Sequence, residues 1–159
     1  MSIAIEQPAT DMTTVPSPRI LIVDEDDADR YALASVLDTT RYRVALAAST
    51  EELRTHLCGS QPDLILCDTT IRGMHGAPYC RWLKTYGSWR YVPVIATTRM
   101  DDPAIVTALL DAGADDVIVK PVGKARELNM RVAVALRIRD RYLHMARRAF
   151  EDAVAQVSK

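Results

Sequence analysis

The sequence contains no long hydrophobic run and no targeting segment. Its uninterrupted apolar stretches all fall short of the roughly 20 residues that a membrane-spanning helix requires. The first 18 residues lack both the basic start and the apolar core of a secretory signal. We therefore expect a cytoplasmic protein that has no membrane anchor.

Cysteine is scarce and its spacing is not that of a metal site. Cys58, Cys67 and Cys80 are odd in number and include no CxxC pair, so they do not match a zinc-binding pattern. We predict that these thiols are reduced and mostly buried.

The small net charge of −1 hides an uneven distribution. Residues 124–159 carry nine Lys and Arg against four Asp and Glu, whereas residues 1–123 carry eleven against seventeen. A basic tail is compatible with nucleic-acid binding, but a solvated basic helix face explains it more simply. Because the tail has no second helix with which to build a recognition motif, we expect no direct DNA binding.

Short apolar strands alternate with helical patterns along the chain. The length and the 48% hydrophobic content suit one domain with a core and an appended element. The predicted strands cover residues 19–23, 42–46, 62–68, 92–98 and 117–119. Five strands separated by helices predict an α/β fold, in which a doubly wound parallel sheet is covered on both faces and the crossovers are right-handed.

Capping residues mark several helix ends. Asp27 can cap the first helix, and Ser49 with Glu52 has the pattern of a capping box for the second. Asp102 and the proline after it open a later helix, which Gly113 closes. The sequence thus predicts several element boundaries as well as the elements.

Polar and charged side chains follow four of the predicted strands. They are Asp24, Glu25 and Asp26 after the first strand, Asp68 at the end of the third, Thr97 and Thr98 at the end of the fourth, and Lys120 after the fifth. Since ligands of open α/β sheets bind at the carboxyl ends of the strands, we expect these side chains at one edge of the sheet. Clustered carboxylates require a compensating cation, and oxygen donors without a His or Cys set favour Mg²⁺ over zinc.

The same cluster predicts a phosphoryl ligand. Mg²⁺ usually binds through one or two carboxylates together with phosphate oxygens, and a threonine hydroxyl and Lys120 would hold the remaining oxygens. In-line attack by Asp68 on phosphorus would then give an aspartyl phosphate. Each feature alone has a structural explanation as a helix N-terminus, strand packing or a solvated lysine, but their coincidence at the strand ends favours a site.

Five stretches in a fixed order give the chain a family resemblance. They are ILIVDED at residues 20–26, PDLILCD at 62–68, GMHG at 73–76, PVIATT at 93–98 and AGADDVIVKP at 112–121. Over roughly residues 19–138 the chain resembles the receiver domains of two-component response regulators. The resemblance implies a flavodoxin-like sheet of five parallel strands in the order 2-1-3-4-5, with an extended C-terminal helix beyond it.

The resemblance also implies how the strand-end residues act. Asp68 would accept a phosphoryl group from a phosphohistidine on a histidine kinase or a histidine phosphotransfer protein. Asp24, Glu25, Asp68 and the backbone carbonyl of Thr70 would bind Mg²⁺, and the phosphoryl group would be lost slowly by self-catalysis. Such a domain consumes a phosphodonor without being a turnover enzyme in the ordinary sense.

By the same resemblance, Thr98 and Lys120 complete the catalytic set. Thr98 matches the switch hydroxyl because it lies five residues after Pro93. Lys120 matches the lysine of the family, and its peptide bond to Pro121 is expected to be cis. A cis bond there would direct the ammonium group back into the site.

Glu25, Val117 and Arg99 are among the positions that depart from the family pattern. Glu25 stands where the main metal ligand is more often Asp, so Asp26 could share that task. Val117 occupies the position of an aromatic switch residue, which leaves signalling to backbone and helix shifts. Arg99 replaces a usually small residue; it either narrows access for water or pairs with the phosphoryl group, or it is a solvated loop arginine.

The helical pattern at the end of the chain is longer than the fold needs. It runs to Val157 with no Pro or Gly after Gly123. A heptad seam consists of Val132, Leu136, Arg139, Leu143, Ala146, Phe150, Ala153 and Val157. This seam predicts a homodimer through a parallel coiled coil, and the alternative is an amphipathic helix folded back on its own domain.

The chain accordingly divides into three parts. We expect a disordered tail at residues 1–18, a receiver domain at 19–138 and a helical extension at 139–159, which by resemblance is a signalling helix leading to an output domain. No output domain follows within these 159 residues. A fragment of a longer regulator, an expression fragment and a stand-alone dimeric relay all remain open.

Two other functions fit parts of the pattern. Asp24-Glu25-Asp26 also fits the signature of haloacid-dehalogenase-like Mg²⁺ phosphatases, with Asp24 as the nucleophile, although a further acidic pair after the lysine and a cap insertion are missing. A receiver-like dimerisation module that is never phosphorylated is the other alternative. Retention of Asp68, Thr98 and Lys120 argues against it.

Overall fold

The computed structural model describes residues 16–71, 74–85 and 87–157. Most of the predicted N-terminal tail, residues 1–15, lies outside the described residues. Within these ranges, no helix combines the length and the apolar character needed to cross a membrane.

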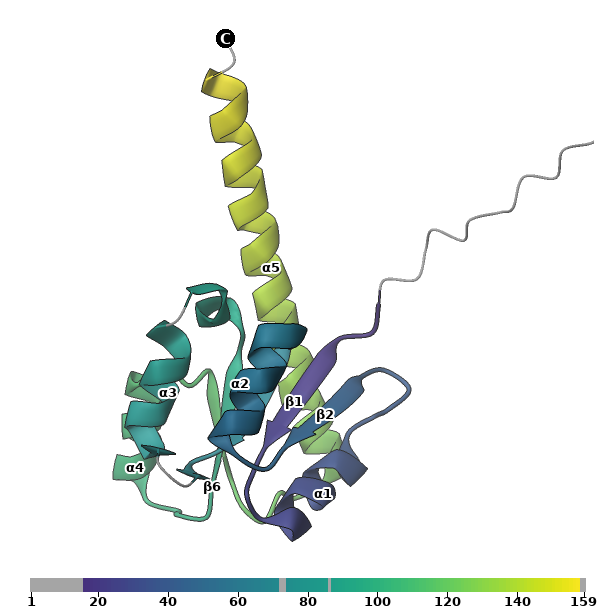
Figure 1. The fold of residues 1–159 in the computed structure, drawn as a ribbon, viewed down its shortest axis with the longest axis vertical. Helices are drawn as coiled ribbons and strands as arrows, with labels where there is room; N and C mark the ends of the chain where they lie inside the picture. Colours follow the sequence, from purple (N-terminus) through teal and green to yellow (C-terminus); the bar gives the residue numbers. More distant parts are fainter. Residues whose placement is uncertain (1–15, 72–73, 86, 158–159) are drawn as a thin grey trace, which may run out of the picture.

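Five parallel strands form the central sheet (Figure 1). In chain order they are β1 (Arg19–Val23), β2 (Arg43–Ala47), β3 (Leu64–Asp68), β6 (Val94–Thr98) and β7 (Asp116–Val119). Their spatial order is β2-β1-β3-β6-β7. If only the five strands of this sheet are numbered in chain order, β6 and β7 become the fourth and fifth strands. The order is then the predicted 2-1-3-4-5, so the flavodoxin-like fold is confirmed.

A second, two-stranded antiparallel sheet lies after β3 and was not predicted. It pairs β4 (Thr70–Ile71) with β5 (Met74–His75). Two-residue strands are too short to show a recognisable alternation of apolar and polar residues, and the glycines of this stretch indicate only a loop.

Helices cover both faces of the central sheet, as doubly wound topology requires (Figure 1). The helical segments are α1 (Asp27–Val36), α2 (Thr50–Gly59), α3 (Gly76–Thr85), the short 3₁₀ helix η1 (Gly87–Tyr91), α4 (Pro103–Asp111) and α5 (Ala125–Val157). On one face, Leu33 of α1 and Val132 of α5 pack against Ile20 and Ile22. On the other face, α2 and α3 pack against Leu21 and its neighbours. Apolar side chains therefore point both ways from each central strand.

The helix caps largely match the sequence pattern. The N-cap of α1 is Asp26, one residue before the predicted Asp27, because the Asp26 side chain accepts a hydrogen bond from the Asp29 amide. Asp102 caps α4, and Gly113 ends that segment with φ +104°. Both of the later positions were predicted.

The last helix, α5, is one continuous helix of 33 residues that projects beyond the domain (Figure 1). Leu128, Val132 and Leu136 are buried in the domain core, whereas Phe150 and Val157 are exposed. The structure therefore corrects the predicted seam: its first two positions pack inside their own domain and are not free for a partner helix. Within the described residues, α5 continues as one helix to Val157 and does not turn back onto the domain.

Candidate functional site

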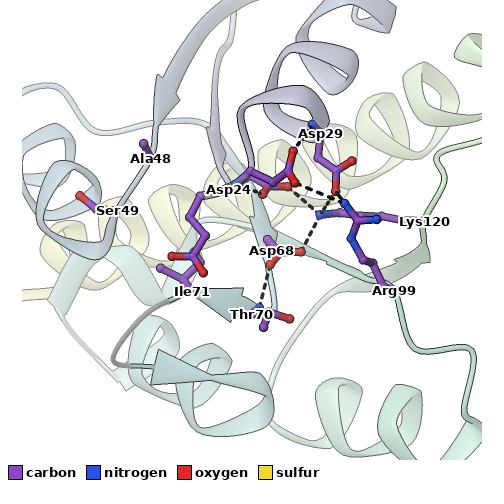
Figure 2. A pocket seen from close by; sticks show the side chains of 11 residues that line it. Asp24, Asp29, Ala48, Ser49, Asp68, Thr70, Ile71, Arg99 and Lys120 are labelled. Atoms are coloured by element: carbon purple, nitrogen blue, oxygen red, sulfur yellow. Dashed lines mark hydrogen bonds and ion pairs between the residues drawn. The ribbon is translucent and has the colours of Figure 1, made fainter.

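The carboxyl ends of β1, β3 and β7 converge on a pocket of about 670 Å³ (Figure 2). The side chains that line it are Asp24, Glu25, Asp26, Asp29, Ala48, Ser49, Asp68, Thr70, Ile71, Arg99 and Lys120. The predicted strand-end acids and the lysine are thus brought together, although they are spread over almost a hundred residues of sequence. Parallel strands produce this arrangement because their carboxyl ends share one edge.

Lys120 lies at the centre of the acidic cluster. Its Nζ atom donates hydrogen bonds to Asp24 Oδ2 and Asp68 Oδ1, both at 2.6 Å, and to Asp29 Oδ2 at 2.9 Å. Its side chain is buried, and the peptide bond between Lys120 and Pro121 is cis, as expected. The ammonium group therefore balances part of the negative charge gathered at this edge.

Asp24 and Asp68 are both buried, and each has a second hydrogen bond. Asp24 Oδ1 accepts from the Asp26 amide at 3.0 Å, and Asp68 Oδ2 accepts from the Thr70 amide at 2.8 Å. A carboxylate offers about four lone-pair positions, so these contacts and Lys120 leave capacity on each. Both carboxylates can still accept from a ligand.

Burial and hydrogen bonding shift the ionisation of this cluster. Desolvation raises the pKa of Asp24 above its ordinary value, even though the hydrogen bond from Lys120 acts in the opposite direction. Desolvation alone would lower the pKa of Lys120, but its hydrogen bonds to Asp24, Asp68 and Asp29 outweigh that effect and raise it. Lys120 is therefore held in its charged form.

The two threonines at the end of β6 differ in their hydrogen bonds. Thr98 is buried, and its Oγ1 accepts a hydrogen bond from the Met100 amide at 3.1 Å, which leaves the hydroxyl proton to donate. Thr97 is also buried, and its Oγ1 has no hydrogen-bond partner among the described residues. Neither threonine is among the residues that line the pocket.

Glu25, Val117 and Arg99, which depart from the family pattern, lie in different surroundings. Glu25 is exposed and lines the pocket beside Asp24. Val117 is half-buried and packs in the small cluster of Cys80 and Leu109 between α3 and α4. Arg99 pairs with the carboxylate of Asp29 in α1.

Asp29 is a pocket residue that sequence reasoning missed. Its Oδ2 accepts from Lys120 and also from the Arg99 guanidinium at 2.6 Å (Figure 2). Arg99 lies 3.6 Å from Asp26 as well. The acidic run from Asp24 to Asp29 was the available signal, but an acid in a first helical turn is ordinarily explained by the helix dipole.

The donor chemistry of the pocket fits a hard divalent cation. Among the residues that the structure describes, no group of three or more His, Cys, Asp or Glu is arranged to hold a metal ion. Mg²⁺ needs fewer protein ligands than such a group provides, because it keeps several waters and binds through one or two carboxylates. Asp24 and Asp68 contact the same ammonium at 2.6 Å, so one small cation could reach both.

Comparison with known proteins decides the family. Residues 20–133 match the model of the response regulator receiver domain. The chain belongs to this family. The receiver resemblance predicted from the five sequence stretches is thereby confirmed, and the response regulator receiver function follows from it.

Curated relatives of the chain are response regulators as well. The chain is 38% identical over 120 residues to the transcriptional regulatory protein AfsQ1 of Streptomyces coelicolor, covering 76% of this chain and 52% of that protein. It is 35% identical over 122 residues to the DNA-binding response regulator MtrA of Mycobacterium tuberculosis, covering 77% and 52%. The chain spans about half the length of the curated relatives it matches.

Two solved receivers have the same fold. The signal receiver domain of a histidine kinase from Syntrophus aciditrophicus is 35% identical with a TM-score of 0.67, covering 76% of this chain and 90% of that one. A CheY-like receiver domain protein from Methanospirillum hungatei is 26% identical with a TM-score of 0.69, covering 80% and 99%. Neither the phosphatase alternative nor the unphosphorylated module is favoured by these similarities.

Proposed function

We propose that this receiver accepts a phosphoryl group on Asp68 from a phosphohistidine of a histidine kinase or a histidine phosphotransfer protein. The observation that carries the proposal is the position of Asp68 at the end of the central strand β3, on the pocket, with Lys120 2.6 Å away. Receiver domains of this family are phosphorylated by histidine kinases, which gives the donor class.

In the proposed reaction, a carboxylate oxygen of Asp68 attacks phosphorus and forms the new oxygen–phosphorus bond. The phosphorus–nitrogen bond to the donor imidazole breaks, and the electron pair stays on that nitrogen. Lys120 donates to the phosphoryl oxygens and stabilises the charge that spreads over them in the transition state. Thr98, whose hydroxyl proton is available, would donate a further hydrogen bond once the phosphoryl group is present.

Asp24, Asp68, Glu25 and the Thr70 carbonyl are the proposed Mg²⁺ ligands, and Asp26 would share the task of Glu25. Support comes from the two buried carboxylates that already share one cation. When bound, Mg²⁺ would neutralise charge on the phosphoryl oxygens. Lys120 would then share Asp24 and Asp68 with the metal.

The product is an acyl phosphate, and we propose that it is lost slowly by hydrolysis within the same site. The pocket opens to solvent beside exposed Thr70 and Arg99, so water can approach phosphorus. Asp68 is then regenerated. One phosphodonor is consumed for each cycle, and no separate substrate is converted.

For output, we propose that the exposed face of α5 binds a second copy of this chain. That face, here called the distal face, consists of Leu143, Ala146, Phe150, Ala153 and Val157. Helical structure outside a folded domain depends on packing of an apolar face, and the heptad spacing suits a helix as the partner. Because Val132 and Leu136 are buried in the domain, the contact would begin after Arg139.

The phosphorylation proposal is tested by incubating the whole chain with acetyl phosphate and Mg²⁺. Intact mass spectrometry should show one added phosphoryl group, and borohydride trapping with peptide mapping should locate it on Asp68. Asp68→Asn should abolish the label, while Asp111→Asn, an exposed acid at the end of α4, should keep it. Label on Asp24, or unchanged labelling of Asp68→Asn, would overturn the proposal.

A further inference from the structure

We propose that Asp29 is a positioning residue that releases Lys120 and keeps Arg99 when Asp68 is phosphorylated, and that this change carries the signal toward α4. The inference rests on the proposed function, since it concerns what the phosphoryl group does after it arrives. Asp29 lies in the first turn of α1, and Figure 2 shows its carboxylate next to both Lys120 and Arg99.

Both cations contact the same oxygen of Asp29. Lys120 Nζ lies 2.9 Å from Oδ2, and an Arg99 guanidinium nitrogen lies 2.6 Å from it. Two positive groups that share one carboxylate oxygen repel each other. Movement of either cation therefore changes the strength of the ion pair between Asp29 and the other cation.

Lys120 has no spare hydrogen to give to a phosphoryl group. An ammonium carries three N–H donors, and here they serve Asp24, Asp68 and Asp29. To bind a phosphoryl oxygen, Lys120 must release one of these carboxylates. The carboxylate that Lys120 releases should be the one for which the loss of this hydrogen bond costs the least free energy.

Asp29 is the carboxylate that loses least. Asp24 is buried, so release of Lys120 would leave its Oδ2 in a poorly solvated position with only the proposed Mg²⁺ to balance its charge. Asp68 stays beside Lys120 because it carries the phosphoryl group itself. Asp29 is a quarter exposed and keeps Arg99, so water and the guanidinium replace the lost ammonium.

Once Lys120 is released, Arg99 no longer shares the Asp29 carboxylate with a second cation, so the Asp29–Arg99 ion pair becomes stronger. Arg99 follows Thr98 directly and stands three residues before Asp102, the N-cap of α4. A tighter Asp29–Arg99 pair would hold this loop against α1. Since Val117 provides no aromatic side chain, this ion pair offers another route from the phosphoryl group to α4.

The chain supplies a matched control. Asp27 lies on the same turn as Asp29 and pairs with Arg30, but it is not among the pocket-lining residues. Asp29→Asn and Asp27→Asn therefore remove the same charge from the same turn. Arg99→Gln removes the partner, and Asp29→Glu restores the carboxylate.

The experiment measures hydrogen exchange of residues 99–105 in the whole chain, with and without beryllofluoride and Mg²⁺, a mimic of the phosphoryl group. Wild type and Asp27→Asn should show slower exchange on addition of the mimic. In Asp29→Asn and Arg99→Gln that protection should fall by about fivefold or more, the size of a modest coupling between sites. Asp29→Glu should recover part of it.

Acetyl phosphate labelling of the same variants separates this inference from the proposed function. Asp29→Asn should still be labelled on Asp68. Full protection of residues 99–105 in Asp29→Asn, or an equal loss in Asp27→Asn, would overturn the role of Asp29 while leaving phosphorylation intact. If the wild-type chain takes no label, the proposed function fails, and the proposed release of Lys120 by Asp29 fails with it.

Discussion

Arg139 of α5 forms an ion pair with Asp63, the residue just before β3, with Arg139 Nη1 3.0 Å from Asp63 Oδ1. The second carboxylate oxygen of Asp63 accepts from the Arg19 amide at 2.7 Å. Asp63 thus joins the start of β1 to the point at which α5 leaves the domain. An arginine that interrupts the predicted heptad seam is explained by this contact, because it binds its own domain.

The division of α5 at Arg139 predicts unequal effects on stability for two leucines of the same seam. Leu136→Ala should lower the free energy of unfolding by about 2–5 kcal/mol, since it opens a cavity in the core. Leu143→Ala, seven residues later on an exposed stretch, should change it by less than about 1 kcal/mol. Urea unfolding of both variants at low protein concentration checks this, and equal losses would contradict the division.

The distal face predicts self-association that a charge should disrupt. Phe150→Glu should weaken the dimer by about tenfold or more, because it places a carboxylate in an apolar contact. Gln156→Glu adds the same charge to the same helix outside the seam and should leave association unchanged. Sedimentation velocity, with and without beryllofluoride, measures it. A wild-type chain that stays monomeric at high micromolar concentration would exclude the dimer.

Mg²⁺ should stabilise the fold through the carboxylates that now share Lys120. A ligand at 100 times its dissociation constant adds about 2.7 kcal/mol, which corresponds to a rise in Tm of several degrees. Asp24→Asn should remove most of this rise, whereas Asp111→Asn should keep it. Thermal unfolding with and without MgCl₂ measures the effect, and an unchanged Mg²⁺ response in Asp24→Asn would remove Asp24 from the ligand set.

The cysteines should react unequally. Cys58 is exposed, while Cys67 and Cys80 are buried. Burial raises the pKa of Cys80 to about 11 and that of Cys67 well above its ordinary value, so at pH 8 roughly one Cys80 in a thousand is a thiolate. A thiol reagent should label one cysteine in the native chain and three in denaturant. A second thiol that reacts as fast as Cys58 would contradict this.

The same shift gives stability a direction with pH. In the unfolded chain a thiol ionises near pH 8.5, whereas folded Cys80 keeps its proton up to about pH 11. Since the folded state binds more protons in this window, stability from Cys80 should fall as pH rises from about 8.5 to 11. Cys80→Ala should reduce that slope, as measured by urea unfolding at several pH values.

The sequence by itself determined the sheet and the chemistry at its edge. Buried strands such as Ile20–Val23 are apolar at every position, and helical stretches repeat their apolar residues every three or four positions, so both are read from local spacing. The parallel order then places Asp24, Asp68 and Lys120 at one edge, because carboxyl ends of parallel strands meet there. The family resemblance came from the five ordered stretches that contain these strand ends.

Only the tertiary structure decided which faces are covered and which charges meet. The heptad spacing treats Val132 and Phe150 alike, yet the domain buries the first and leaves the second exposed. Asp29 contacts both Lys120 and Arg99, although each is far from Asp29 in the sequence. They meet because the start of α1 lies beside the ends of β6 and β7. Periodicity specifies which side chains share a face, whereas long-range packing specifies what lies against it.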